Sequence, residues 1–106
     1  PHVTDYTDVD IGLIGISGIE ADGSLCDFDY REVTVARTII QQSRQVWLVA
    51  DASKFNRPAM VKLAELRQID VLFTDARPPE PFMALMAEAG VDCVIAGAKD
   101  EDPADA

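Results

Sequence analysis

The sequence predicts an α/β domain with a mostly parallel sheet and flanking helices. Short apolar runs recur along the chain and are nearly continuous, as is typical of strands buried on both faces of a parallel sheet. Amphipathic helical patterns separate these runs, which favours right-handed crossover connections. The chain has 106 residues, of which 48% are hydrophobic and 26% charged, so we expect one globular domain.

The predicted elements alternate along the chain in the order β-α-β-(short)-β-α-β. Four apolar runs are the predicted strands: residues 11–16, 46–50, 71–73 and 91–96. Residues 60–63 are predicted to be extended, and residues 65–68 to form one helical turn. Trp47 and Phe73 lie within strand patterns and are expected in the core.

Two helices are predicted between these strands. A capping box from Asp29 to Glu32 starts the first helix, which we expect over residues 30–43. The second helix follows the Pro78-Pro79 pair and ends at Gly90, a residue that favours helix termination. Each helix has one apolar face: Val33, Ala36, Ile39 and Ile40 in the first, and Phe82, Leu85, Met86 and Ala89 in the second.

Charge and cysteine content exclude several classes of function. Nine basic residues against 19 acidic ones give a net charge of −10, so direct binding to nucleic acid or to an anionic membrane is disfavoured. No apolar run approaches the roughly 18 residues of a membrane span. Cys26 and Cys93 lie far apart in apolar surroundings, which favours buried free thiols in a cytosolic protein. No cluster has metal-ligand spacing, and no cofactor is expected.

A glycine-containing segment, Gly15-Ile-Ser17-Gly18, follows the first predicted strand. Ligands of open α/β sheets bind beyond the carboxyl ends of the strands, and glycines there let backbone N–H groups approach a ligand. The alternative is a tight strand exit that binds nothing. The Asp22-Gly23 pair that follows indicates a turn.

The most informative segment is Asp51-Ala-Ser-Lys54, directly after the second predicted strand. The Lys54 ammonium suits a phosphate or another anion, and the Asp51 carboxylate accepts hydrogen bonds from sugar-like hydroxyls. Arg57 offers a second cation. The alternative is a surface ion pair between Asp51 and Lys54, which contributes little to stability. Asp75, after the third strand, is interpreted as a cap of the loop that follows it.

These motifs occur in an order that resembles the C-terminal sensor domain of DeoR-family transcriptional repressors. The likeness extends over residues 10–96 and rests on these segments: residues 15–19, 22–23, 27–32, 48–55, 69–70 and 74–75. Residues 30–33 and 54–60 are most similar to the branch of the family that represses glycerol-3-phosphate regulons.

The resemblance implies a sensor that binds a phosphorylated sugar or a glycerol-3-phosphate-like metabolite. It implies a sheet like that of ribose-5-phosphate isomerase and the CoA transferases. Matched positions assign effector binding to five residues: Gly15, Ser17, Gly18, Asp51 and Lys54. DNA binding would reside in an N-terminal winged helix-turn-helix outside this chain, and the parent is expected to form homo-oligomers. Residues 1–96 would be the C-terminal part of the sensor, without its phosphate loop, and residues 97–106 an acidic disordered tail.

Two other functions remain open from the sequence. The first is a sugar-phosphate isomerase-like enzyme, but residues 25–29 lack the Lys and glycine run of the isomerases. No general base is evident there, so we expect no enzyme activity. The second is a module whose main role is oligomerisation, because a truncated sheet leaves edges and apolar faces to cover.

Overall fold

The computed structural model describes residues 9–96, which contain two sheets, two α-helices and two short 3-10 helices. The strands are β1 (Val9–Gly15), β2 (Gly18–Ile19), β3 (Ser24–Asp27), β4 (Ser43–Val49), β5 (Val61–Glu65), β6 (Val71–Thr74) and β7 (Asp92–Ile95). The helices are α2 (Tyr30–Gln42), α3 (Glu80–Ala89), η1 (Ala52–Lys54) and η2 (Leu66–Gln68). The predicted tail, residues 97–106, lies outside the described residues.

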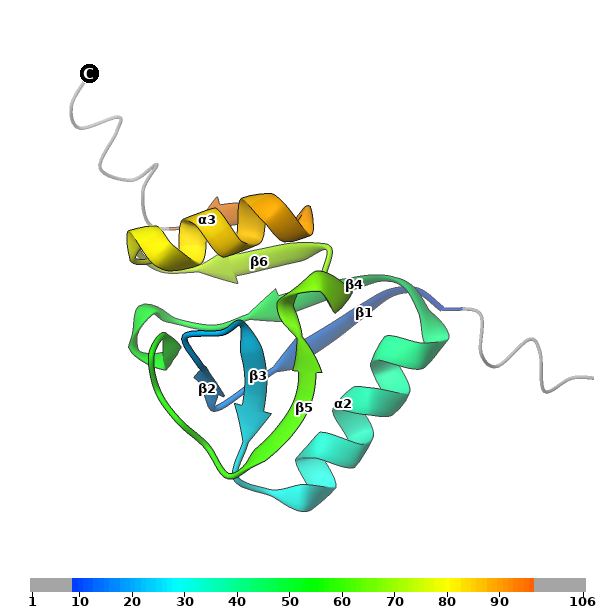
Figure 1. The fold of residues 1–106 in the computed structure, drawn as a ribbon. Coiled ribbons are helices and arrows are strands. Elements are labelled where there is room, and N and C mark those ends of the chain that lie inside the picture. The colour runs from blue at the N-terminus through cyan, green and yellow to red at the C-terminus, as the bar shows by residue number, and fades with distance from the viewer. Residues whose placement is uncertain (1–8, 97–106) are drawn as a thin grey trace, which may run out of the picture.

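The larger sheet is parallel and confirms the predicted fold class. Its strands are ordered β1-β4-β6-β7, and every neighbouring pair runs in the same direction. All four carboxyl ends therefore lie at one edge of the sheet (Figure 1). Each of the four apolar runs forms one of these strands, within a few residues of the predicted bounds.

A smaller antiparallel sheet, ordered β2-β3-β5, was not predicted. Strand β2 has only two residues, so its pattern is too short to be distinguished from a turn. The predicted Asp22-Gly23 turn joins β2 to β3. There the Asp22 carboxylate accepts the N–H of Ser24 at 2.9 Å, and Gly23 has a φ of 91°, which favours glycine.

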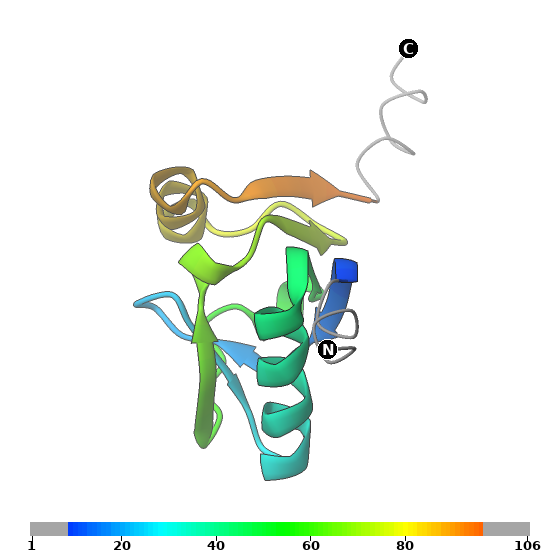
Figure 2. The same ribbon diagram turned by 90° about the vertical axis from the view of Figure 1, so that its right-hand side faces the viewer.

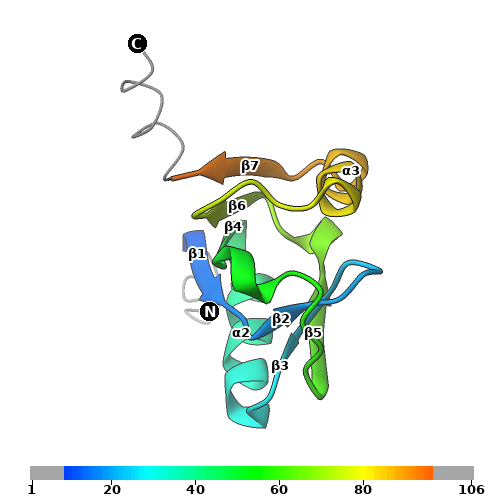
Figure 3. The same cartoon turned by 90° about the vertical axis from the view of Figure 1, so that its left-hand side faces the viewer.

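Both α-helices and the small sheet lie on the same side of the parallel sheet (Figures 2 and 3). The core fills the space between these layers. Its fully buried side chains include Ile19, Leu25, Val33, Leu48, Leu72, Phe82 and Met86. In the described part of the chain, no helix or strand covers the opposite face of the parallel sheet (Figure 2).

The ends of the two α-helices follow from local chemistry. Asp29 caps α2 by accepting the N–H of Arg31 at 2.8 Å, one residue before the Glu32 position that a capping box uses. Helix α2 ends at Gln42 because Ser43 already belongs to β4. Gly90 ends α3 in the left-handed conformation with a φ of 78°, as predicted. No helix among residues 9–96 is long and apolar enough to cross a membrane.

Trp47 and Phe73 are not core residues, contrary to the prediction. Their rings lie 5.1 Å apart on the uncovered face of the parallel sheet, and both side chains are only half-buried. A continuous apolar strand pattern does not reveal which face is covered, so the pattern alone places both faces inside. Cys26 is buried and Cys93 half-buried, and both are free.

Candidate functional site

A hollow of about 200 Å³ lies at the carboxyl edge of the parallel sheet, where β4, β6 and β7 end. It is lined by Val49, Ala50, Asp51, Phe73, Thr74, Asp75 and Ala96. Backbone hydrogen bonds hold the three strand ends together: Ala50 N–H to Phe73 at 3.0 Å and Ala96 N–H to Thr74 at 2.8 Å. These backbone hydrogen bonds therefore fix the positions of the strand ends from which the polar residues of the next loops begin.

Asp51 and Lys54 both follow β4 and contact each other, but only Asp51 lines the hollow. Asp51 is the N-cap of η1, and its Oδ1 accepts the backbone N–H of Ser53 at 2.9 Å and the Ser53 hydroxyl. Its Oδ2 accepts the Lys54 ammonium at 3.2 Å. The two side chains that the sequence singled out thus form one charged pair, and Asp51 lines the hollow itself.

The environment keeps the Asp51 carboxylate ionised. Hydrogen bonds from the Ser53 hydroxyl and backbone, followed by that from Lys54, hold the pKa of Asp51 below its ordinary value of 3.8. The Lys54 side chain is 24% exposed and that of Asp51 is 49% exposed. A solvent-exposed ion pair of this kind contributes little to stability, so an anion with more charge than a carboxylate can compete for Lys54.

Thr74 and Asp75 line the same hollow from the end of β6. The Asp75 Oδ1 accepts the N–H of Ala52 at 2.8 Å. This carboxylate therefore holds the loop after β4, whereas the sequence predicted that it would cap the loop following Asp75 itself. The Thr74 hydroxyl is buried and has no hydrogen-bond partner among the described residues. A buried hydroxyl without a partner is rare and calls for an explanation.

The glycine segment lies beside the loop that carries Asp51 and Lys54. Gly15 pairs with Val49 on β4, and a Cβ at Gly15 would meet only the Val49 carbonyl at 3.9 Å. Gly18 differs, because a Cβ there would lie 1.9 Å from the carbonyl oxygen of Arg57. Close packing of β2 against Arg57 thus already requires glycine at position 18. Ser17 donates its backbone N–H to Cys26 at 3.1 Å.

The loop after η1 is fixed to β2 by its backbone and to α3 by a side chain. Asn56 donates its N–H to Ile19 at 2.8 Å, and Phe55 forms a bridge with the same residue. The Phe55 ring is buried and lies 5.0 Å from the ring of Phe82 in α3. Of the predicted site residues, Asp51 and Lys54 touch each other, and the glycine segment approaches their loop from the side.

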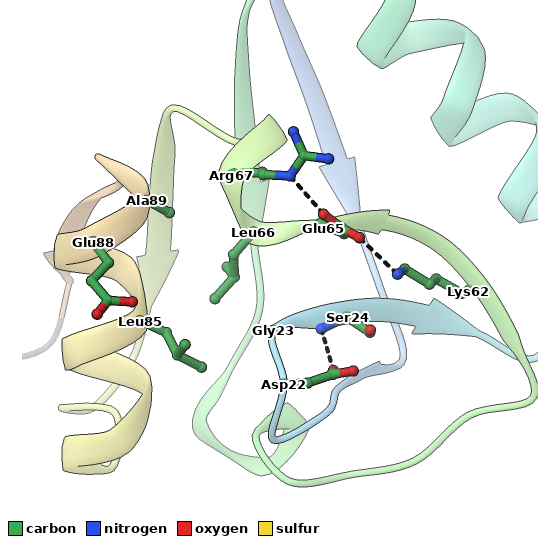
Figure 4. A pocket seen from close by; sticks show the side chains of 10 residues that line it. All are labelled: Asp22, Gly23, Ser24, Lys62, Glu65, Leu66, Arg67, Leu85, Glu88 and Ala89. Carbon is green, nitrogen blue, oxygen red and sulfur yellow. Dashed lines mark hydrogen bonds and ion pairs between the residues drawn. The ribbon is translucent and has the colours of Figure 1, made fainter.

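A larger groove of about 360 Å³, which the sequence did not predict, lies between α3 and the β2–β3 turn (Figure 4). Leu66 and Leu85 point into it from η2 and α3 (Figure 4). The charges along its rim neutralise one another: Glu65 accepts Lys62 at 2.9 Å and Arg67 at 2.7 Å. The hollow at the strand ends is the candidate site because Asp51, which the sequence singled out, lines it at the carboxyl edge of the parallel sheet.

Comparison with known proteins decides the family. The family model for the DeoR C-terminal sensor domain matches residues 2–76, which include β1–β6 and the Asp51–Lys54 loop. The chain belongs to this family. The resemblance that the sequence motifs predicted is thereby confirmed, and the site lies within a sensor domain of the DeoR type.

Three of the similar proteins are transcriptional repressors by name. The chain is 49% identical over 80 residues to the glycerol-3-phosphate regulon repressor of Escherichia coli (strain K12), a match that covers 76% of the chain and 32% of the relative. It is 48% identical over 91 residues to the repressor of the same name from Haemophilus influenzae, a match that covers 86% of the chain and 35% of that relative. The repressor GlcR of Bacillus subtilis (strain 168) is 37% identical over 87 residues, covering 82% and 33%. The chain thus spans about a third of the length of these relatives.

Proposed function

We propose that this chain is the effector-binding part of a DeoR-type transcriptional repressor, and that its effector is a small phosphorylated polyol or sugar, with glycerol 3-phosphate the first candidate. The observation that carries the proposal is the Asp51–Lys54 pair, of which Asp51 lines the hollow on the carboxyl edge of the parallel sheet. The names of the similar repressors support this chemistry.

Each group of the proposed site has a chemical role. The phosphoryl group replaces Asp51 as the partner of the Lys54 ammonium, which the weakness of that exposed pair permits. Asp51 then accepts hydrogen bonds from the ligand hydroxyls, because its ionised carboxylate is an acceptor only. Gly15, Ser17 and Gly18 do not line the hollow, and we propose that they approach the ligand from beside the loop of Asp51 and Lys54. A Cβ at Gly15 would meet nothing nearer than the Val49 carbonyl at 3.9 Å, which leaves space there.

The proposed role is regulatory rather than enzymatic. DNA binding would be carried by an N-terminal helix-turn-helix outside this chain, which agrees with the net charge of −10 on the chain itself. An effector changes DNA affinity only if it binds two arrangements of the repressor unequally. The two predicted binding side chains are an acid and a cation already paired with each other, which suits ligand exchange better than proton abstraction.

The test is thermal unfolding of the full-length repressor during titration with glycerol 3-phosphate, glycerol and related sugar phosphates. A ligand at about 100 times its dissociation constant stabilises the folded state by about 2.7 kcal/mol. We expect a rise in Tm with a phosphorylated ligand, none with glycerol, and loss of the response in Lys54→Ala. Lys62→Ala is the matched control, because Lys62 also pairs with a carboxylate three residues away but lies in the other groove. Equal responses of the two variants, or none in the wild type, would contradict the proposal.

A second candidate function, oligomerisation, is favoured by the uncovered sheet face. Leu13 is 60% exposed and Val49 is 49% exposed on that face, beside the stacked Trp47 and Phe73 rings. Light scattering at several concentrations distinguishes a monomer from a homo-oligomer, and Leu13→Ser disrupts assembly if this face is the interface. An oligomer unchanged by that substitution would place the interface elsewhere.

A further inference from the structure

Asp75 lies on a different strand from the two charged residues of the proposed site, yet it contacts their loop. Its Oδ1 accepts the Ala52 N–H at 2.8 Å, across 23 residues of sequence. Ala52 is the first residue of η1, and the first N–H groups of a helix have no partner within the helix. The carboxylate at the end of β6 therefore supplies a bond that the loop cannot make for itself.

The other N–H groups of this loop are satisfied by the loop or by β2. Those of Ser53 and Lys54 bond to Asp51, and that of Phe55 bonds to Ala52. Asn56 bonds to Ile19 on β2. Contacts from outside the loop thus hold residues 52–56 in two places: at Ala52, through Asp75, and at Phe55 and Asn56, through Ile19 and the Phe82 ring. Lys54 lies between these two points, so its position depends on both.

We infer that Asp75 is a positioning residue of the effector site, which fixes the start of η1 and thereby holds Lys54 beside Asp51, the charged residue of this loop that lines the hollow. The inference rests on the proposed function, because a positioning role for Asp75 presupposes that an effector binds at this site. Its physical basis is independent, because the Ala52–Asp75 hydrogen bond joins the ends of neighbouring strands β4 and β6 whatever the ligand is. A hydrogen bond to a charged acceptor is stronger than a neutral one, which makes this carboxylate an effective anchor.

The decisive comparison is between two substitutions of the same residue. Asp75→Ala removes the acceptor for Ala52, whereas Asp75→Asn keeps an oxygen there and removes only the charge. If Asp75 positions the loop, we expect Asp75→Ala to weaken binding of the phosphorylated ligand about tenfold and Asp75→Asn to restore most of it. Asp22→Ala is the matched control, because Asp22 also accepts a backbone N–H, at 2.9 Å, but in the β2–β3 turn.

A double-mutant cycle separates positioning from general loss of stability. If Asp75 acts through Lys54, its substitution has little further effect on ligand affinity once Lys54 is alanine. Independent, additive losses in the cycle would overturn the inference, as would equal binding by Asp75→Ala and the wild type. Equal losses of affinity in Asp75→Ala and Asp75→Asn would also overturn it if Asp75→Asn keeps the Ala52 N–H protected, because the charge rather than the hydrogen bond would then act on the ligand.

Hydrogen exchange at Ala52 distinguishes failure of this inference from failure of the proposed function. We expect Asp75→Ala to speed exchange of the Ala52 N–H about tenfold without ligand, and Asp75→Asn to change it less. If no phosphorylated compound binds the wild-type repressor, the proposed function fails. The exchange rate of the Ala52 N–H still tests whether Asp75 holds the start of η1. Unchanged exchange in Asp75→Ala would overturn the positioning role even if the ligand binds.

Discussion

The two faces of the parallel sheet have similar composition but opposite surroundings. On one face, Leu48 and Leu72 are fully buried and belong to the same core cluster as residues of the helices and the small sheet. On the other face, Leu13 and Val49 are exposed and Trp47 is half-buried. Residues on neighbouring strands that pair in register share a face, so each face is continuous across the sheet.

This difference teaches what holds the domain together and what the domain still exposes. Burial of apolar surface is the main stabilising contribution, so the covered face carries the stability of the fold. An exposed apolar face of this kind on a parallel sheet is where a partner would pack, and it is the basis of the oligomerisation proposal. The hollow with Asp51 lies at the carboxyl edge where these two faces meet.

The largest expected effect comes from truncating leucines on the two faces. Leu48→Ala removes a fully buried side chain and should lower the free energy of unfolding by about 3 kcal/mol. Leu13→Ala, with a side chain 60% exposed, should cost less than about 1 kcal/mol. Urea denaturation of both variants measures the difference. Equal costs would break the comparison, because they would mean that the second face is also covered in solution.

Substitutions at two glycines, one closely packed and one on the open face, should give the next largest difference in stability. Gly18→Ala forces a Cβ to within 1.9 Å of the Arg57 carbonyl, so β2 or the Arg57 loop must shift, at a cost of about 2 kcal/mol. Gly15→Ala on the open side meets its nearest atom at 3.9 Å and should change stability by less than about 0.5 kcal/mol. Denaturant midpoints of the two variants check this. A Gly18→Ala variant as stable as the wild type would contradict the close packing.

Much of the fold was predictable because strand and helix signals are local. The four parallel strands, the glycine that ends α3 and the cap at Asp29 each depend on a few neighbouring residues. The small sheet was not predictable, because its register depends on contacts between distant segments: Leu25 pairs with Ala64. For the same reason, no periodicity separates the covered face from the open one.

The site was predictable only where its residues are adjacent in sequence. Asp51 and Lys54 stand three residues apart at a strand end, so their pairing follows from local geometry. The hydrogen bond from Ala52 to Asp75 joins two strand ends 23 residues apart. Local sequence therefore predicted, wrongly, that Asp75 caps the loop that follows it. One signal pointed to it: a polar residue directly after an apolar strand, at the same edge as Asp51.

Thr74 is a buried polar residue on the covered face of the parallel sheet. Its substitution should increase stability, by less than Leu48→Ala and Gly18→Ala decrease it. Its hydroxyl is buried without a partner, so Thr74→Val should raise the free energy of unfolding by about 1 kcal/mol. Thr38→Val in α2, where the hydroxyl is exposed and bonds to Thr34 at 3.0 Å, is the control and should give no gain. Urea midpoints measure both. A loss of stability in Thr74→Val would mean that the hydroxyl has a partner in solution.

The smallest expected effect is the acid response of Asp51, at the edge shared by the two faces. Its pKa lies below the ordinary value of 3.8 in the folded state, so the unfolded state binds more protons as the pH falls through this range. The stabilisation is therefore present above about pH 4 and is lost as the pH falls through the folded-state pKa. Asp51→Asn keeps an acceptor for Ser53 but cannot titrate, so its Tm should fall less than that of the wild type between pH 5 and pH 3. Exposure keeps the difference small, and identical slopes would mean that the contacts to Ser53 and Lys54 do not stabilise the folded state in solution.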